Sequence, residues 1–98
     1  MMNSSESSAV KIKKFDGKDF NLWKSKVENS LMYLDLDGYL TVKGEGEDKV
    51  KKDKKALAFI KDSLSDTLFR RYNETSAKEL WDKLKVDFAT VDAQMLFM

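Results

Sequence analysis

The side chains that could do chemistry in this sequence are carboxylates, lysines and hydroxyls, because the chain has no histidine and no cysteine. Most nucleophile–base pairs and nearly all transition-metal sites need one of those two residue types. Asp35 and Asp37 stand in a DLDG segment that has the form of half a calcium loop. A complete loop needs further ligands and a closing glutamate, so the segment is interpreted as a helix end and a turn. We therefore expect no enzyme, no metal site and no cofactor.

A cluster of lysines is the main charged feature: Lys49, Lys51, Lys52, Lys54 and Lys55. Such a cluster can contact nucleic-acid phosphates or an acidic partner. Four acidic residues lie among or next to these lysines and offset much of their field: Glu45, Glu47, Asp48 and Asp53. No aromatic residue lies between the lysines to stack on bases, and the net charge of the whole chain is only +1. We interpret the cluster as a solvated helix face, with a contact surface as the alternative.

Apolar spacing predicts the elements that position these residues. Apolar residues recur every three or four positions over residues 19–34, at Phe20, Trp23, Val27, Leu31 and Leu34, which predicts an amphipathic helix. The Asp19 carboxylate is expected to cap its start. A short helical turn is expected at 36–40, a flexible loop at 43–47 and a second long helix at 48–63. The buried side of that helix is expected to hold Ala56, Leu57, Phe59, Ile60 and then Leu64.

Cap signals mark two further helices. Ser65 is placed to cap a short helix that ends between residues 69 and 72. Ser76 and Glu79 have the spacing of a capping box, in which each side chain bonds the other residue's backbone N–H. The stripe that follows holds Ala77, Leu80, Trp81, Leu84 and Phe88, and continues almost in phase through Val91, Met95 and Met98. Before the first helix, Ile12 and Phe15 are expected to reach the core from an extended segment that ends at a turn at 16–17.

Two groups of apolar residues have no place in this core. Leu22 and Tyr33 lie opposite the buried stripe of the first helix and predict a second, weaker contact face. Met95, Leu96, Phe97 and Met98 cover all sides of a helix, so one small domain cannot bury them all. The simplest interpretation of this end is a helix that continues in a longer protein. Both groups are candidates for self-association.

Composition bounds the class of protein. The chain has 98 residues, of which 42% are hydrophobic and 36% charged, which is typical of one small globular domain. No apolar run approaches the roughly 20 residues of a membrane span. The absence of proline favours helices. We expect an all-α bundle of four to five helices over residues 11–98, a disordered polar tail at 1–10, a cytoplasmic location and no membrane partner.

Three segments, in order and in register over about residues 11–90, resemble the Gag polyprotein of Ty1/copia-type retrotransposons. Phe15-Asp16-Gly17 with Phe20 and Trp23 resembles its F-x-G-x-x-[FY]-x-x-W opening. Residues 55–66 are similar to its "kA…I…sLsd" segment, and residues 75–84 to its "tAkelWdkL" helix.

The resemblance implies the N-terminal part of a capsid protein that assembles with itself into a shell around RNA. Phe15, Gly17, Trp23 and Trp81 carry over only as fold-defining positions, because the family offers no catalytic residue. Family members continue into further helices and often a zinc knuckle that binds RNA, so this chain is expected to be truncated at its C-terminal end. The expected partners are a second copy or the downstream capsid domain, with RNA a weaker partner and no small-molecule substrate. The alternatives are a host-domesticated Gag module that binds another protein, and a nucleic-acid contact module built on the lysine cluster.

Overall fold

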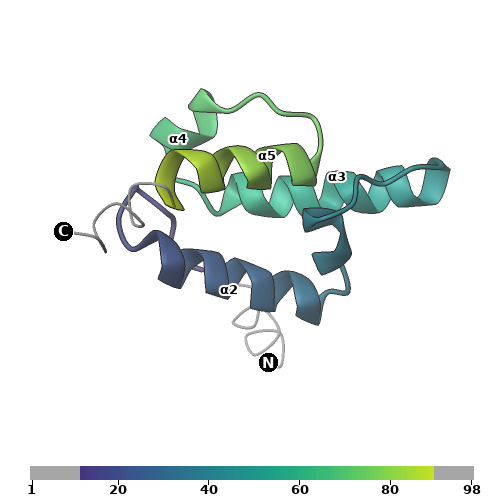
Figure 1. The fold of residues 1–98 in the computed structure, drawn as a ribbon, viewed down its shortest axis with the longest axis horizontal. Helices are drawn as coiled ribbons and strands as arrows, with labels where there is room; N and C mark the ends of the chain where they lie inside the picture. The colour runs from purple at the N-terminus through teal and green to yellow at the C-terminus, as the bar shows by residue number, and fades with distance from the viewer. Residues whose placement is uncertain (1–11, 90–98) are drawn as a thin grey trace, which may run out of the picture.

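Helices dominate residues 12–89, the range that the structure, a computed structural model, describes (Figure 1). In chain order the elements are α2 (Phe20–Tyr33), the 3₁₀ turn η1 (Asp37–Leu40), α3 (Glu47–Asp62), α4 (Asp66–Arg71), α5 (Ala77–Leu84) and the π-helical turn η2 (Lys85–Ala89). Within this range there is no strand, only an isolated bridge between Phe15 and Leu64. The all-α class is confirmed. The tail expected at residues 1–10 lies outside the described range.

One hydrophobic core joins the elements. Figure 1 shows α5 lying along α3, with α2 on one side of this pair and α4 on the other. The apolar stripes predicted from spacing face inward, and both tryptophans are core residues, as expected. The main buried side chains are Phe20, Trp23, Val27 and Leu31 of α2, Ala56 and Ile60 of α3, and Ala77, Leu80, Trp81 and Leu84 of α5. Leu57 and Phe59 are only partly buried.

The C-terminal end of α2 differs from the prediction. Leu34 was expected on the buried stripe, but its side chain is 41% exposed. The helix ends at Tyr33, and Asp35 takes a left-handed backbone conformation with φ of 63°. This conformation turns the chain, so that Leu36 enters the core in place of Leu34. The interpretation of DLDG as a helix end and a turn is confirmed.

The start of α2 also differs. Asp19 precedes the helix with φ of 56°, again left-handed, and its side chain makes no capping hydrogen bond, so the expected carboxylate cap is wrong. Only the backbone carbonyl of Asp19 hydrogen-bonds to the helix, by accepting from the Trp23 N–H at 3.1 Å. The turn before it is built by Asp16, whose carboxylate accepts from the Lys18 N–H at 3.1 Å, and by Gly17, whose φ of 107° suits a residue without a side chain.

Phe15 anchors the lead-in segment to the junction of α3 and α4. Its N–H donates to the Ser63 carbonyl and its carbonyl accepts from the Ser65 N–H, both at 2.8 Å. The indole N–H of Trp23 donates to the same Ser63 carbonyl at 3.2 Å. Phe15 is 2% exposed and Ile12 packs against the core, as predicted.

Asp53 is a buried structural residue rather than part of a solvated face. Its side chain is turned inward and only 4% of the residue is exposed. One carboxylate oxygen accepts from the Gly44 N–H at 2.9 Å, and the other from the Ala77 N–H at 2.8 Å. Asp53 therefore ties α3 both to the preceding loop and to the first turn of α5. Its placement corrects the expectation that it offsets the lysine cluster at the surface.

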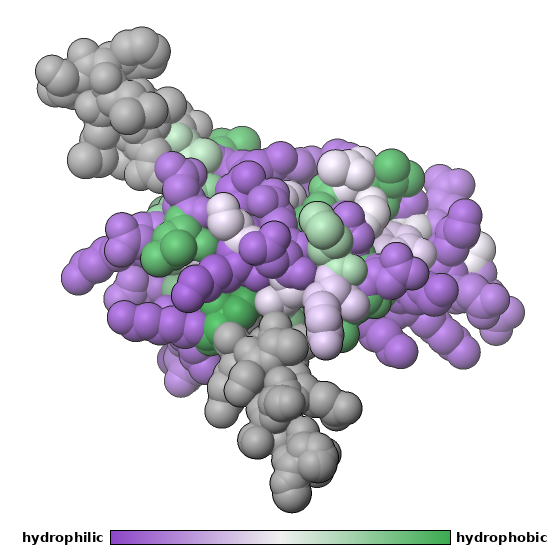
Figure 2. Space-filling view, turned by 90° about the horizontal axis from the view of Figure 1, so that it is seen from below, coloured by the Kyte–Doolittle hydropathy of each residue, from purple (hydrophilic) through white to green (hydrophobic). Residues whose placement is uncertain are grey.

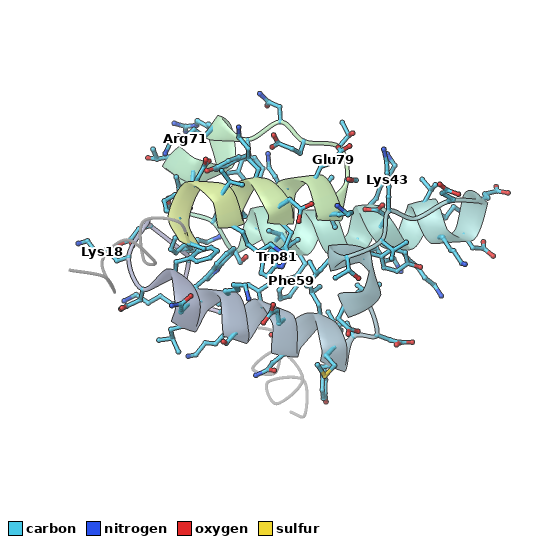
Figure 3. The ribbon with its side chains drawn as sticks, in the orientation of Figure 1. Lys18, Lys43, Phe59, Arg71, Glu79 and Trp81 are labelled. Atoms are coloured by element: carbon cyan, nitrogen blue, oxygen red, sulfur yellow. The ribbon has the colours of Figure 1, made fainter. Side chains whose placement is uncertain are left out.

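The two predicted caps are present. The hydroxyl of Ser65 accepts from the Leu68 N–H, and that of Ser76 from the Glu79 N–H at 3.2 Å. The reciprocal half of the capping box is not formed, because the Glu79 carboxylate lies 3.6 Å from the Lys43 ammonium instead (Figure 3).

The last described turn, η2, is wound as a π-helix, which widens the turn after α5. In this turn the Phe88 ring contacts the Phe15 ring edge-on, with centroids 4.9 Å apart, and stacks on Phe20 at 5.9 Å. Phe15 in turn stacks on Trp23 at 4.8 Å, and Trp23 lies 5.7 Å from Trp81. The aromatic residues of the first and third sequence segments thus form one cluster with Phe88 inside the core.

Candidate functional site

The residues that carry the Gag resemblance have packing roles. Phe15, Phe20, Trp23 and Trp81 lie in the aromatic cluster, and Ala56, Ile60 and Leu64 are buried. Ser63 accepts the indole hydrogen bond of Trp23, and Ser65 caps α4. The motifs therefore account for the fold of the chain, and any functional surface has to be sought among exposed residues.

Leu22 and Tyr33 are exposed, with 58% and 72% of their surface accessible. Eleven residues at about 100° each place them about 20° apart around the axis of α2 and about 16 Å apart along it. They lie on the same side of the helix but at opposite ends. Figure 2, which looks onto the α2 side, shows separate apolar areas with hydrophilic residues between them. The predicted second face is therefore two local surfaces.

The first surface, at the N-terminal end of α2, is a groove with a volume of about 310 Å³. Ile12, Phe15, Leu22 and Trp23 supply its apolar lining. Its charged lining holds four lysines and two aspartates: Lys13, Lys14, Lys18, Lys26, Asp16 and Asp19. Four positive and two negative charges give the groove a net charge of +2. The sequence predicted only Leu22 of these residues as a contact residue and placed Ile12, Phe15 and Trp23 in the core, because the groove forms when residues 12–16 fold back beside α2.

The second surface is the C-terminal end of α2, where three consecutive apolar or aromatic side chains face solvent. Met32 is 60% exposed, Tyr33 72% and Leu34 41%. Asp35 and Asp37 follow, and neither has an ion-pair partner within 4.0 Å among residues 12–89. This end of the helix therefore combines apolar side chains with carboxylates.

All five clustered lysines are exposed, as predicted. Figure 1 shows the N-terminal turns of α3, which carry them, extending beyond the end of α5. None of the five has an ion-pair partner within the described residues. Lys52 and Lys55 line a groove of about 360 Å³ together with Phe59 and Leu34. Lys52, Lys55 and Phe59 follow the i, i+3, i+7 spacing of one helix face, so the structure places an aromatic ring beside two of the lysines although none lies between them in the sequence.

Acid–base chemistry has little support in the geometry. The Tyr72 hydroxyl donates to the Asp87 carboxylate at 2.5 Å. Burial and then this hydrogen bond raise the pKa of Tyr72 far above its usual range. The hydrogen bond from Lys78 lowers the pKa of Asp82, which lies on the exposed side of α5. The Tyr72–Asp87 pair links the end of α4 to η2, and the Lys78–Asp82 pair links neighbouring turns of α5. Neither pair lies in one of the grooves described above.

Within residues 12–89, no three histidine, cysteine, aspartate or glutamate side chains are grouped closely enough to hold a metal ion. In the same range, no helix has the length and apolar character needed to cross a membrane. The candidate residues Met95, Leu96, Phe97 and Met98 lie outside the described residues. No protein-family model, no curated protein and no solved structure matches the chain.

Proposed function

We propose that this chain is a structural module that assembles with itself, as the N-terminal capsid-like domain of a copia-type Gag. The observation that carries the proposal is the pair of exposed surfaces at the two ends of α2. Leu22, Met32 and Tyr33 are each more than half exposed although a complete core lies beneath them. Large apolar side chains gathered on a surface are typical of protein–protein contacts. The Gag-like motifs supply the fold that holds these surfaces, and the module has no catalytic role.

Sedimentation equilibrium over a wide concentration range tests the proposal. We expect the average mass to rise with concentration. A strict monomer over the whole range would refute self-assembly. If a pull-down recovered unrelated proteins and never a second copy, the module would be better described as a host-domesticated interaction domain.

A nucleic-acid contact is a second candidate, favoured by the unpaired lysines on α3 and by Phe59 beside them. Phosphate contacts release counterions, so binding to a single-stranded oligonucleotide should weaken steeply as salt rises. Lysine-to-alanine changes at 51, 52, 54 and 55 should reduce that salt dependence. The matched control is Lys83→Ala on α5, which should leave it unchanged. Weak binding without a steep salt dependence would dismiss this candidate.

A further inference from the structure

We propose that the groove between α3 and the turn after α2 binds one base of a single-stranded nucleic acid, and that it favours a base with an amino group. The groove has a volume of about 360 Å³, and its lining includes Asp35, Lys52, Lys55 and Phe59. This inference rests on the second candidate function, the nucleic-acid contact, and names the part of the strand that the groove recognises.

The lining of the groove offers an aromatic ring for stacking. Phe59 is partly buried and packs against the core, so the fold holds its ring in place while the ring still borders the groove. Figure 3 shows Phe59 on the side of α3 that faces α2. Leu34, which is 41% exposed, and Leu36 complete the apolar lining. Every base has a flat face that can stack on such a ring, whatever the sequence of the strand.

Two lysines stand where phosphates would flank a stacked base. Lys52 and Lys55 share one face of α3 with Phe59, since their spacing is i, i+3 and i+7. Both lysines are exposed, and neither has an ion-pair partner among residues 12–89. Their ammonium groups are therefore free to contact the phosphates on the two sides of the base.

The charge around the groove is positive but small. Its lining holds two lysines and one aspartate, which leaves a net charge of +1. A second groove that shares Asp35 adds two lysines and two acidic residues, which cancel: Lys43, Lys49, Asp37 and Glu45. The balance admits an anion, and the choice of ligand must come from the chemical groups in the lining.

The Asp35 carboxylate makes that choice. It forms no ion pair with either lysine of its groove, although all three side chains line the same space. A carboxylate repels phosphates and other carboxylates, but it accepts a hydrogen bond from a base amino group, as in contacts of aspartate with N4 of cytosine. A nucleic-acid strand combines a stacking face, an amino donor and flanking phosphates, and therefore matches all three parts of the groove. An acidic peptide would match only the lysines.

Fluorescence anisotropy with two labelled strands tests the base preference in the full chain. Ten-nucleotide strands of deoxycytidine and of deoxyuridine are compared, because cytosine has an amino group where uracil has a carbonyl oxygen. The deoxycytidine strand should bind at least about fivefold more tightly. Asp35→Asn should abolish this difference, since the carboxamide can both donate and accept. Asparagine also tolerates the left-handed backbone at this position, where φ is 63°, so the fold is kept.

Two further variants test the ring and the lysines. Phe59→Leu keeps an apolar side chain against the core but removes the stacking face, and should weaken binding of both strands at least about fivefold. Lys52→Ala should weaken both strands more than Lys54→Ala does. Lys54→Ala is the matched control, because it removes the same charge about 200° around the axis of α3, outside the groove. Circular dichroism checks that each variant is folded.

A preference for deoxycytidine that is lost in Asp35→Asn, together with weaker binding of Phe59→Leu, supports the base site. Equal binding of the two strands, or a preference that survives Asp35→Asn, overturns it and leaves a contact without base recognition. Equal effects of Lys52→Ala and Lys54→Ala would show a diffuse field and also overturn it, as would displacement of the strand by an acidic peptide at a lower concentration than by unlabelled strand. If neither strand binds, the nucleic-acid candidate itself fails together with this inference, and the proposal of self-assembly is unaffected.

Discussion

Replacing Asp53 by alanine should destabilise the domain more than any other change of a charged residue within residues 12–89. The carboxylate is buried and accepts from two buried backbone N–H groups, those of Gly44 and Ala77. Alanine would leave both donors without an acceptor and would detach the first turn of α5 from α3. Hydrogen bonds to a charged group contribute about 1.5–3 kcal/mol each, so the expected loss is about 3–6 kcal/mol.

That loss is large against the total stability of a domain of this size, which is about 5–15 kcal/mol. For domains of 60–100 residues, each kcal/mol lowers the Tm by about 4–8 °C. The Asp53→Ala variant should therefore melt at least about 12 °C below the unmodified chain. Asp53→Asn keeps one acceptor oxygen and should lose about half as much free energy.

Urea unfolding followed by the fluorescence of the two buried tryptophans measures the difference directly. A loss of 3 kcal/mol or more shifts the midpoint by about 1 M or more, for a urea slope of up to about 3 kcal/mol/M. Asp48→Ala is the matched control, because Asp48 is exposed on the same helix. It should change stability by no more than about 1 kcal/mol, through the loss of a negative charge in the first turn of α3. If Asp53→Ala and Asp48→Ala were equally stable, the assignment of Asp53 as a structural clamp would be wrong.

Three further changes test other parts of the fold. Gly44→Ala would bring a Cβ against the backbone carbonyl of Lys49 in α3 and should lower the free energy of unfolding in urea by about 1–3 kcal/mol. The control is Gly38→Ala, whose Cβ meets nothing within 4 Å, and it should lower that free energy by less than about 0.5 kcal/mol. Phe88→Ala removes one ring of the aromatic cluster and should cost about 2–3 kcal/mol; an unchanged midpoint would show that η2 does not close the core. The pKa of Tyr72 is raised in the folded state by burial and by its hydrogen bond to Asp87. As pH rises, the unfolded chain therefore loses the tyrosine proton before the folded chain does. The free energy of unfolding should fall as pH rises above the usual tyrosine pKa of 10.0. Tyr72→Phe should lack that component when the unfolding free energies at about pH 8 and about pH 11 are compared, and an identical pH dependence in both proteins would contradict this assignment.

Local sequence patterns were enough to predict where the helices lie and most of the residues on their buried faces. The spacing of Phe20, Trp23, Val27 and Leu31 repeats with the period of a helix, and the structure buries all four. The caps at Ser65 and Ser76 were also readable, since each depends on residues within three positions.

Features that depend on contacts between distant segments, or on unusual backbone conformations, were not predictable in this way. Asp53 was misplaced for a different reason, because its residue type suggested the surface although its spacing from Ala56 and Ile60 places it on the buried side of α3. Asp19 and Asp35 adopt left-handed conformations that are rare outside glycine, and these two positions account for the failed cap and for the exposure of Leu34. The apolar groove at the start of α2 depends on the backbone hydrogen bonds between Phe15 and residues 63–65. No periodic pattern in the local sequence predicts these bonds.

The contact between Phe15 and Phe88 has a consequence for how the chain acquires its fold. These two rings lie 73 positions apart in the sequence, so the aromatic cluster joins nearly the first and the last described residues. At a synthesis rate of about 5–20 residues per second, about 4–15 s separate their appearance at the ribosome. During that interval Phe15, Phe20 and Trp23 lack a covering ring and form an exposed apolar surface, which in a crowded cell is a target for chaperones or for other nascent copies of the same chain. Contacts of such long range also slow folding. Completion of the core should therefore be a late event, achieved only after α5 and η2 have been made.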